Sequence, residues 1–138
     1  MSELATSKVL TDAHLHRLGD IRLGLLRLHK TLLEMERTDY EKVFGRVTAG
    51  ELLQLVINHA QFGWLRLISA LVVEIDEVLT DDEPATLDDF EQLISQARLL
   101  LTSPDNDEFK TKYQAALQRE PAVVMAHSAV VQLLRKDQ

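Results

Sequence analysis

The stretch "LGDIRLGLLRLHKTLLEM", residues 18–35, decides the class of fold. Large apolar residues recur in it every three or four positions, at Leu18, Ile21, Leu25, Leu28, Leu32 and Met35. A helix turns once every ~3.6 residues, so this spacing gathers these side chains in one stripe. Stripes of this kind interlock with those of neighbouring helices, and the pattern therefore predicts helices packed side by side.

Capping residues place the ends of this first helix. Thr11 and Asp12 are both good N-cap residues, because their side-chain oxygens accept hydrogen bonds from the orphan amides of a first turn. We expect the helix to continue to about Arg37 and at most to Phe44, since Gly45 suits the backbone at a helix end.

A second long helix is predicted to begin at the sequence "TAGE", where Thr48 and Glu51 match the capping-box pattern. Its apolar stripe, which includes Leu53, Ile57, Trp64 and Leu67, predicts one continuous helix that ends near Leu79. Both helices would be about 40 Å long at the rise of an α-helix. Two such helices joined by about ten residues pack best in antiparallel directions.

The rest of the chain also reads as helix. Thr86 caps a third helix that stops before Pro104, a less apolar segment follows near 107–119, and Pro121 opens the last helix. We therefore predict an all-α protein with a single domain over residues 1–138. The expected architecture is a mainly antiparallel four-helix bundle with an additional or broken helix near 107–119.

The composition narrows the classes of function. The chain has 138 residues, no cysteine and a net charge of −7. Disulfides and thiolate metal sites are excluded, and the polar N-terminus lacks the apolar core of a signal peptide, so we expect a cytoplasmic protein. The negative charge argues against nucleic acid as a partner, because phosphate binding needs a basic face. Residues 52–73 are long enough to span a membrane, but their internal amides and histidine favour a buried bundle helix.

Acidic residues gather in one part of the sequence. Between Leu67 and Ala97 there is no basic residue, whereas many positions are Asp or Glu. One interpretation is a solvated turn followed by a helix N-terminus, where negative charge is favourable. The other is a patch that attracts a cation or a basic partner. We favour the first, because the spacing does not match a calcium-binding loop.

Two histidines lie on apolar helix faces and are candidate metal ligands. His59 sits within "LLQLVINHAQFGWLRL", and His127 is centred in the stripe of the last helix. Bundles build metal sites from facing side chains, so this pair could hold a divalent metal such as zinc or nickel, completed by Glu36 or Glu74. The alternative is that each imidazole is a neutral core residue with a hydrogen-bond partner, which we favour. We predict no catalytic residues.

The segment "VTAGELLQLVINHAQFGWLRLI", residues 47–68, resembles the second helix of DinB-like (YfiT-like) four-helix bundles. In that family a polar entry leads into a helix with one histidine, followed shortly by tryptophan or another bulky residue. The resemblance implies that His59 is the first ligand of a three-histidine site for a divalent metal, and that His127 can be one of the later two. The family spaces those two by four residues, and Val123 and Val131 occupy the corresponding positions here. The third ligand is therefore missing.

Part of the second helix has more apolar surface than one bundle core can cover. Leu55 and Phe62 share a side with Arg66 and point away from the predicted stripe, so these three residues form a possible interface. This surplus could be covered by the broken helix near 107–119 or by a second copy of the chain, and a symmetric dimer is the commonest solution for such a patch.

Three functions remain open from the sequence. We expect a non-enzymatic interaction or structural domain that forms a homodimer. The first alternative is a degenerate DinB-like bundle that binds a divalent metal or a small ligand through His59 and His127. The second is a small-ligand pocket or sensor without metal.

Overall fold

The computed structural model describes residues 9–103 and 107–135. These residues form seven helices and no named strand: α1 (Asp12–Phe44), α2 (Ala49–Asn58), α3 (Ala60–Gly63), α4 (Arg66–Thr80), α5 (Leu87–Thr102), α6 (Glu108–Arg119) and α7 (Pro121–Leu134). One isolated antiparallel bridge joins Val9 to Thr86. The prediction of an all-α protein is confirmed. Within the described ranges, no helix has the length and hydropathy needed to cross a lipid bilayer.

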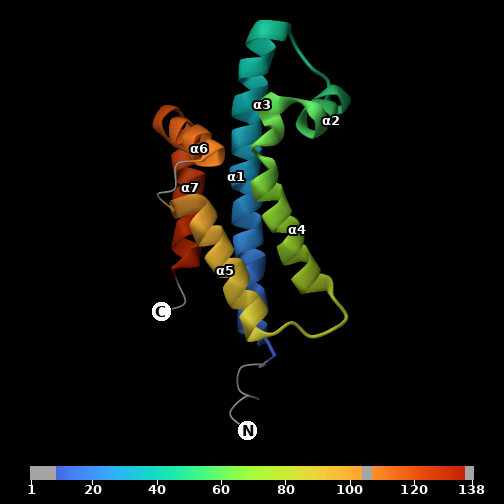
Figure 1. Ribbon diagram of the computed structural model, residues 1–138, viewed down its shortest axis with the longest axis vertical. Coiled ribbons are helices and arrows are strands. Elements are labelled where there is room, and N and C mark those ends of the chain that lie inside the picture. The colour runs from blue at the N-terminus through green and yellow to red at the C-terminus, as the bar shows by residue number, and fades with distance from the viewer. Residues whose placement is uncertain (1–8, 104–106, 136–138) are drawn as a thin grey trace.

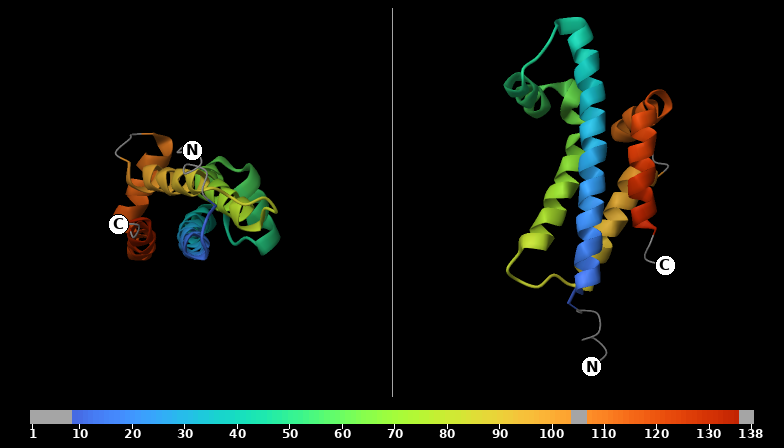
Figure 2. Two further views of the ribbon diagram at one scale, coloured as in Figure 1. Left: turned by 90° about the horizontal axis from the view of Figure 1, so that it is seen from below. Right: turned by 180° about the vertical axis from the view of Figure 1, so that it is seen from behind.

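Helix α1 runs the length of the molecule and organises the other helices (Figure 1). α4 returns along one side of α1, α7 lies along its other side, and α5 lies behind it in the rear view of Figure 2. The main interhelical contacts of α1 are with α7 and α4. The short helices α2 and α3 sit at the end of the molecule where α1 finishes (Figure 1).

The sequence signals at both ends of α1 act as predicted. The Thr11 side chain accepts a hydrogen bond from the His14 backbone amide, and the His14 side chain accepts one from the Thr11 amide, which completes a capping box. Gly45 ends the helix with φ of 92°, a left-handed conformation that side chains rarely adopt. The predicted stripe is buried from Leu18 to Leu32. α1 follows the longer of the two predicted lengths.

Glycine also sets the approach of α7 to α1. A Cβ atom added at Gly24 would lie 2.8 Å from Val130 Cγ2. This is too close for two carbon atoms, so the hydrogen at this position lets the two helices pack at their present distance.

The second predicted helix is not continuous. At His59 the backbone is extended, with φ −93° and ψ 133°, and this residue separates α2 from α3. The His59 ring nitrogen Nδ1 accepts a hydrogen bond from the Gln61 amide at 3.1 Å and so caps the new helix start. The expectation of one helix to Leu79 is therefore wrong, although the capping box of Thr48 and Glu51 is present as predicted.

The remaining helix boundaries follow the predictions closely. Thr86 caps α5 in a capping box with Asp89, and Pro121 occupies the first turn of α7. Asp107 caps α6, whose backbone amide at Lys110 donates to the Asp107 carboxylate at 2.9 Å. α6 is the predicted additional helix, and it packs against α7.

Candidate functional site

Helix α2 is the most unusual element of the fold because none of its ten residues, all of which are described, is buried. Its sequence "AGELLQLVIN" nevertheless contains five aliphatic side chains larger than alanine. Leu53 and Ile57, one helical turn apart, keep 58% and 49% of their surface exposed. Val43 and Phe44 at the end of α1 are 74% and 66% exposed. We call these four residues the distal apolar face.

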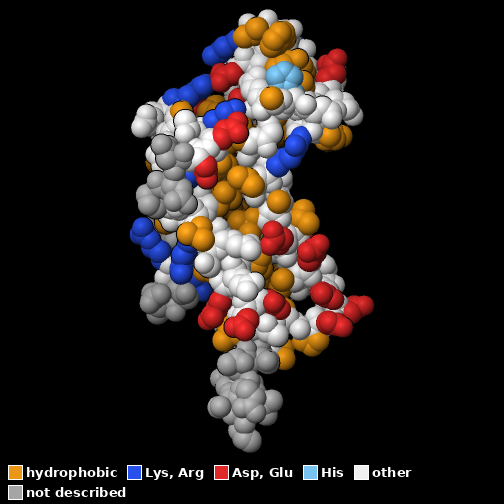
Figure 3. Space-filling view, in the orientation of Figure 1, with side chains coloured by type: hydrophobic (Ala, Val, Ile, Leu, Met, Phe, Trp, Pro, Cys, Tyr) orange, Lys and Arg blue, Asp and Glu red, His pale blue; other side chains and the backbone are white. Residues whose placement is uncertain are grey.

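The distal apolar face lies at one end of the molecule. Hydrophobic side chains gather over the end of α1 and over α2 in the space-filling view (Figure 3). The Tyr40 ring links these two regions, with ring centroids 4.7 Å from Phe44 and 5.5 Å from His59. Apolar patches of this kind on a single chain commonly mark an interaction surface.

A buried carboxylate fixes the chain next to α2. Glu36 on α1 is only 8% exposed, and both of its carboxylate oxygens accept hydrogen bonds. Trp64 Nε1 donates to Glu36 Oε2 at 2.8 Å, and Gln61 Nε2 donates to Oε1 at 2.9 Å and to the Glu36 backbone carbonyl at 3.1 Å. These bonds tie α3 and Trp64, the residue that ends it, to α1, so α2 projects from a fixed base.

An aromatic chain continues from this anchor into the core. The Trp64 ring lies 5.5 Å from that of Phe109, Phe109 stacks on Tyr113 at 5.3 Å, and Tyr113 lies 5.4 Å from His127. The Tyr113 hydroxyl and His127 Nδ1 are 2.7 Å apart and hydrogen-bonded. Burial raises the pKa of Tyr113, so its hydroxyl remains protonated.

His127 is held as a neutral residue. Burial lowers its pKa, and the positive charge of Lys110 lowers it further. The Lys110 side chain is itself buried, and its Nζ donates to the Leu100 carbonyl at 3.4 Å. His127 therefore has a hydrogen-bond partner, Tyr113, that belongs to the core.

Among the described residues, the contacts of His59 and His127 are made with different partners. His59 contacts the Gln61 amide and the rings of Tyr40 and Phe62. Within the described part of the chain, these residues are different from the partners of His127. Glu36, one candidate for completing a metal site, is engaged by Gln61 and Trp64. No group of three or more metal-binding side chains occurs among the described residues.

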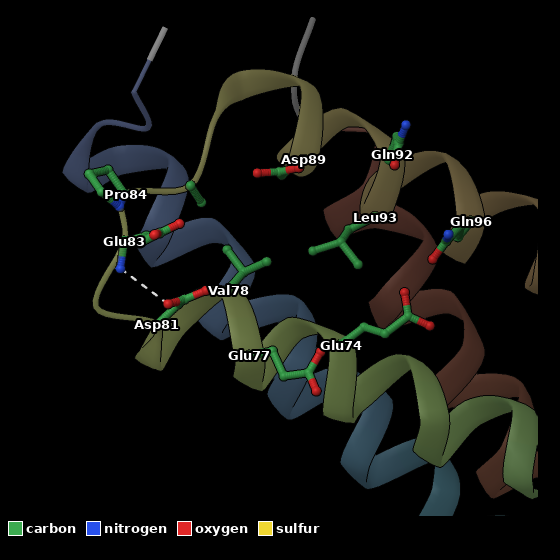
Figure 4. A pocket seen from close by; sticks show the side chains of 11 residues that line it. Glu74, Glu77, Val78, Asp81, Glu83, Pro84, Asp89, Gln92, Leu93 and Gln96 are labelled. Carbon is green, nitrogen blue, oxygen red and sulfur yellow. Dashed lines mark hydrogen bonds between the residues drawn. The ribbon is translucent and has the colours of Figure 1, made fainter. Parts of the chain in front are cut away.

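Glu74, the other candidate, lines an acidic groove between α4 and α5 (Figure 4). The groove has a volume of about 320 Å³ and is lined by Glu74, Glu77, Asp81, Glu83 and Asp89 among other residues. Two of these carboxylates serve local structure: Asp81 accepts from the Glu83 amide at 3.1 Å, and Asp89 from the Thr86 amide at 3.0 Å. These bonds agree with the interpretation of a turn and a helix start.

The three predicted interface residues differ in their surroundings. Phe62 is fully buried within the chain, against the rings of Tyr40 and His59, and so provides no surface for another molecule. Leu55 is half-buried, and Arg66 is exposed. Arg66 donates through Nη2 to the Ile57 carbonyl at the end of α2.

The residues of the distal apolar face were missed by the sequence analysis. Leu53 and Ile57 were assigned to the buried stripe of the second helix, and their exposure contradicts that assignment. α2 is apolar on most sides, so its sequence does not indicate which side lacks cover.

Comparison of the chain with protein-family models, with curated proteins and with solved structures finds no match. The resemblance of residues 47–68 to DinB-like bundles therefore stays a prediction.

Proposed function

We propose that the protein is a non-enzymatic interaction domain that pairs with a second copy of itself through the distal apolar face. In this proposal α1, α4, α5 and α7 form an antiparallel four-helix scaffold, and α2 is the presented element. The cytoplasmic location expected from the sequence belongs to the same proposal. The observation that carries the proposal is an aliphatic helix with no buried residue, attached to an anchored base.

Charge supports a second copy as the partner. The four residues of the distal apolar face are uncharged, so a matching apolar surface is the best cover. Glu51 is exposed in the first turn of α2. Arg66, the first residue of α4, is also exposed, and its Nη2 donates to the Ile57 carbonyl in the last turn of α2. When two α2 helices pair in antiparallel directions, Glu51 of one copy approaches Arg66 of the other. A two-fold axis makes this contact twice.

The size of the surface predicts a weak dimer. Stable interfaces bury about 800 Å² on each partner, and one short helix with the end of another offers less. We therefore expect a dissociation constant in the micromolar range or weaker, with monomer and dimer in rapid exchange.

The test is sedimentation velocity over a wide range of protein concentration, with Leu53→Glu compared to Leu99→Glu. Leu53 and Leu99 are similarly exposed, at 58% and 62%, but Leu99 lies on α5, away from the distal apolar face. We expect wild type and Leu99→Glu to dimerise as concentration rises and Leu53→Glu to remain monomeric. A wild-type monomer at every concentration, or equal loss in both variants, would contradict the proposal.

A further inference from the structure

A single residue prevents α2, α3 and α4 from forming one continuous helix. Trp64 and Leu65, between α3 and α4, both have right-handed helical backbone angles, with φ of −66° and −70°. His59 differs, because its ψ of 133° is extended. A rotation of about 175°, chiefly in this one angle, would bring ψ to the helical value near −42°. α2 would then continue the axis of α3 and α4.

The break divides one helical hydrogen bond into two halves. In a continuous helix the Gln61 amide would donate to the Ile57 carbonyl, four residues before it. In the structure the Gln61 amide donates to His59 Nδ1 at 3.1 Å, and Arg66 Nη2 donates to the Ile57 carbonyl. Two side chains thus replace the two ends of a single backbone bond. Both backbone groups keep a partner in the bent form, and they would bond to each other in the continuous form.

The apolar stripe of the sequence fits the continuous form. Leu53 and Leu71 are separated by 18 residues, which is five full turns of a helix, and Ile57 and Trp64 lie near the same side. Trp64 and Leu71 are buried in the structure, whereas Leu53 and Ile57 are exposed. In a continuous helix, Leu53 and Ile57 would therefore turn to the side on which Trp64 meets α1.

The end of α1 offers a surface for this side of α2. The Tyr40 ring already contacts His59, and its centroid lies 4.7 Å from that of Phe44, one turn further along α1. Val43 and Phe44 are exposed, so no other described segment occupies this place. Residues 45–48 connect the two helices and span up to about 13 Å when extended. This is more than the roughly 8–10 Å between the axes of packed helices, so α2 can lie against α1 while both remain folded.

We propose that His59 is a hinge between an open and a closed position of α2. In the open position, which is the one described above, the distal apolar face is exposed for a second copy of the chain. In the closed position α2 continues α4, and Leu53 and Ile57 cover the end of α1 within the same chain. Closure thus competes with the dimer for one apolar surface. This competition rests on the proposed dimer, whereas the hinge itself does not.

The first test is a distance across the hinge, measured by pulsed electron paramagnetic resonance between nitroxide labels at Gln54→Cys and Glu77→Cys. Both residues are exposed, and the chain has no cysteine of its own. In a continuous helix their Cα atoms would be about 35 Å apart, at 1.5 Å for each residue. The bend between α2 and α4 makes the open distance shorter (Figure 1). Labelled chains are diluted with excess unlabelled chain, so that each distance belongs to one molecule.

Two variants of the hinge residue form a matched pair. His59→Ala removes the acceptor of the Gln61 amide and introduces the strongest helix former, so the population near 35 Å should increase several-fold over wild type. His59→Asn keeps a side-chain oxygen that can cap a helix start, and its distances should stay those of wild type. Identical distributions in the two variants would overturn the hinge. A broad distribution in His59→Ala would also overturn it, because α2 would then have unfolded instead of closing.

Alkylation of a single thiol tests whether the continuous helix covers the end of α1. Ile57 is 49% exposed in the open position, so iodoacetamide should react readily with Ile57→Cys. Adding His59→Ala should slow this reaction several-fold, whereas adding His59→Asn should leave the rate unchanged. Equal rates in the two double variants would overturn the closed position.

Sedimentation velocity separates the hinge from the dimer. If both proposals hold, His59→Ala should dimerise several-fold more weakly than His59→Asn, because closure hides the distal apolar face. A wild type that stays monomeric while the distances change as expected would contradict the dimer and support the hinge. A wild type that dimerises while His59→Ala keeps the wild-type distances would contradict the hinge alone.

Discussion

Helices α2 and α4 come from one predicted helix and have similar aliphatic content, yet the structure uses them differently. α4 buries Ile68, Leu71, Val72 and Ile75 against the rest of the protein, whereas none of the described residues of α2 is buried. The difference arises at His59 and Glu36. The chain leaves the helix at His59, and Glu36 binds the segment that follows. The apolar sequence makes both helices capable of burial, but the hydrogen bonds of Glu36 determine that α4 and not α2 packs against the core.

The largest expected effect is on the free energy of unfolding, when isoleucine is replaced by alanine in α4 and, for comparison, in α2. Ile75 on α4 is 1% exposed and Ile57 on α2 is 49% exposed. Ile75→Ala leaves a cavity and should lower the free energy of unfolding by about 2–5 kcal/mol. Ile57→Ala should lower it by less than about 1 kcal/mol, because water already reaches this side chain. Urea denaturation measured at a concentration where the protein is monomeric checks both values.

Equal destabilisation by these two variants would show that α2 is packed as tightly as α4. The comparison would then fail, and the distal apolar face would lose its basis.

Phe62→Glu is unsuitable as an interface test, because Phe62 is fully buried and a carboxylate there would unfold the chain.

Helix ends were predictable because their signals are local. Thr11, Thr48 and Thr86 each act through a residue three positions away, and Gly45 and Pro121 act through their own backbone. These features depend on neighbours that any sequence window includes. The stripe of α1 was predictable for the same reason, since its period is a property of consecutive turns.

The break at His59 was not predictable from such windows. It is stabilised by Glu36, which precedes Gln61 and Trp64 by 25 and 28 positions. The exposure of Leu53 and the burial of Phe62 follow from this break, because it changes which side of the chain faces the core. For the same reason the sequence pattern indicated Phe62 as an interface residue and did not indicate Leu53 and Ile57.

The next prediction tests the Glu36 anchor, which holds Gln61 and Trp64 against α1. Glu36→Ala leaves the buried Trp64 indole N–H without its acceptor and should destabilise the protein by about 2–4 kcal/mol. Trp64 fluorescence should shift to longer wavelength as water reaches the ring. Glu34→Ala, on an exposed side of the same helix, is the matched control and should cost less than about 0.5 kcal/mol. Equal effects of the two variants would show that the anchor contributes nothing.

The stability of the folded protein should also depend on pH, through His127. Its pKa is lowered in the folded protein, so the unfolded chain takes up a proton first as the pH falls. Stability should therefore be complete above about pH 7 and decrease as the pH falls through about 6.5, the ordinary value of histidine. Burial lowers the pKa of His29 too, and this residue acts in the same direction.

His127→Gln should reduce this pH dependence but not abolish it, because His29 remains. Leu53→Glu should leave the pH dependence of stability unchanged, since α2 has no buried residue. Denaturation midpoints between about pH 5.5 and 8 provide the measurement, above the range where the lowered pKa values of Asp39 and Glu41 become important. A profile with the same slope in wild type and His127→Gln would exclude His127 as a source of the pH dependence.

The smallest expected effect is that of added zinc or nickel on the melting temperature. If His59 and His127 are structural residues in different environments, zinc or nickel should leave the melting temperature of wild type within error. Each ring already has its Nδ1 in a hydrogen bond, to the Gln61 amide in one case and to the Tyr113 hydroxyl in the other. A shared ion needs one ring nitrogen of each histidine within about 2.1 Å of the metal, so both side chains would have to face the same ion. A saturable rise with nickel in wild type that is lost in both His59→Ala and His127→Ala would instead support the metal-binding alternative. A rise lost only in His59→Ala would assign the metal to the end of α2, next to the surface proposed for the dimer.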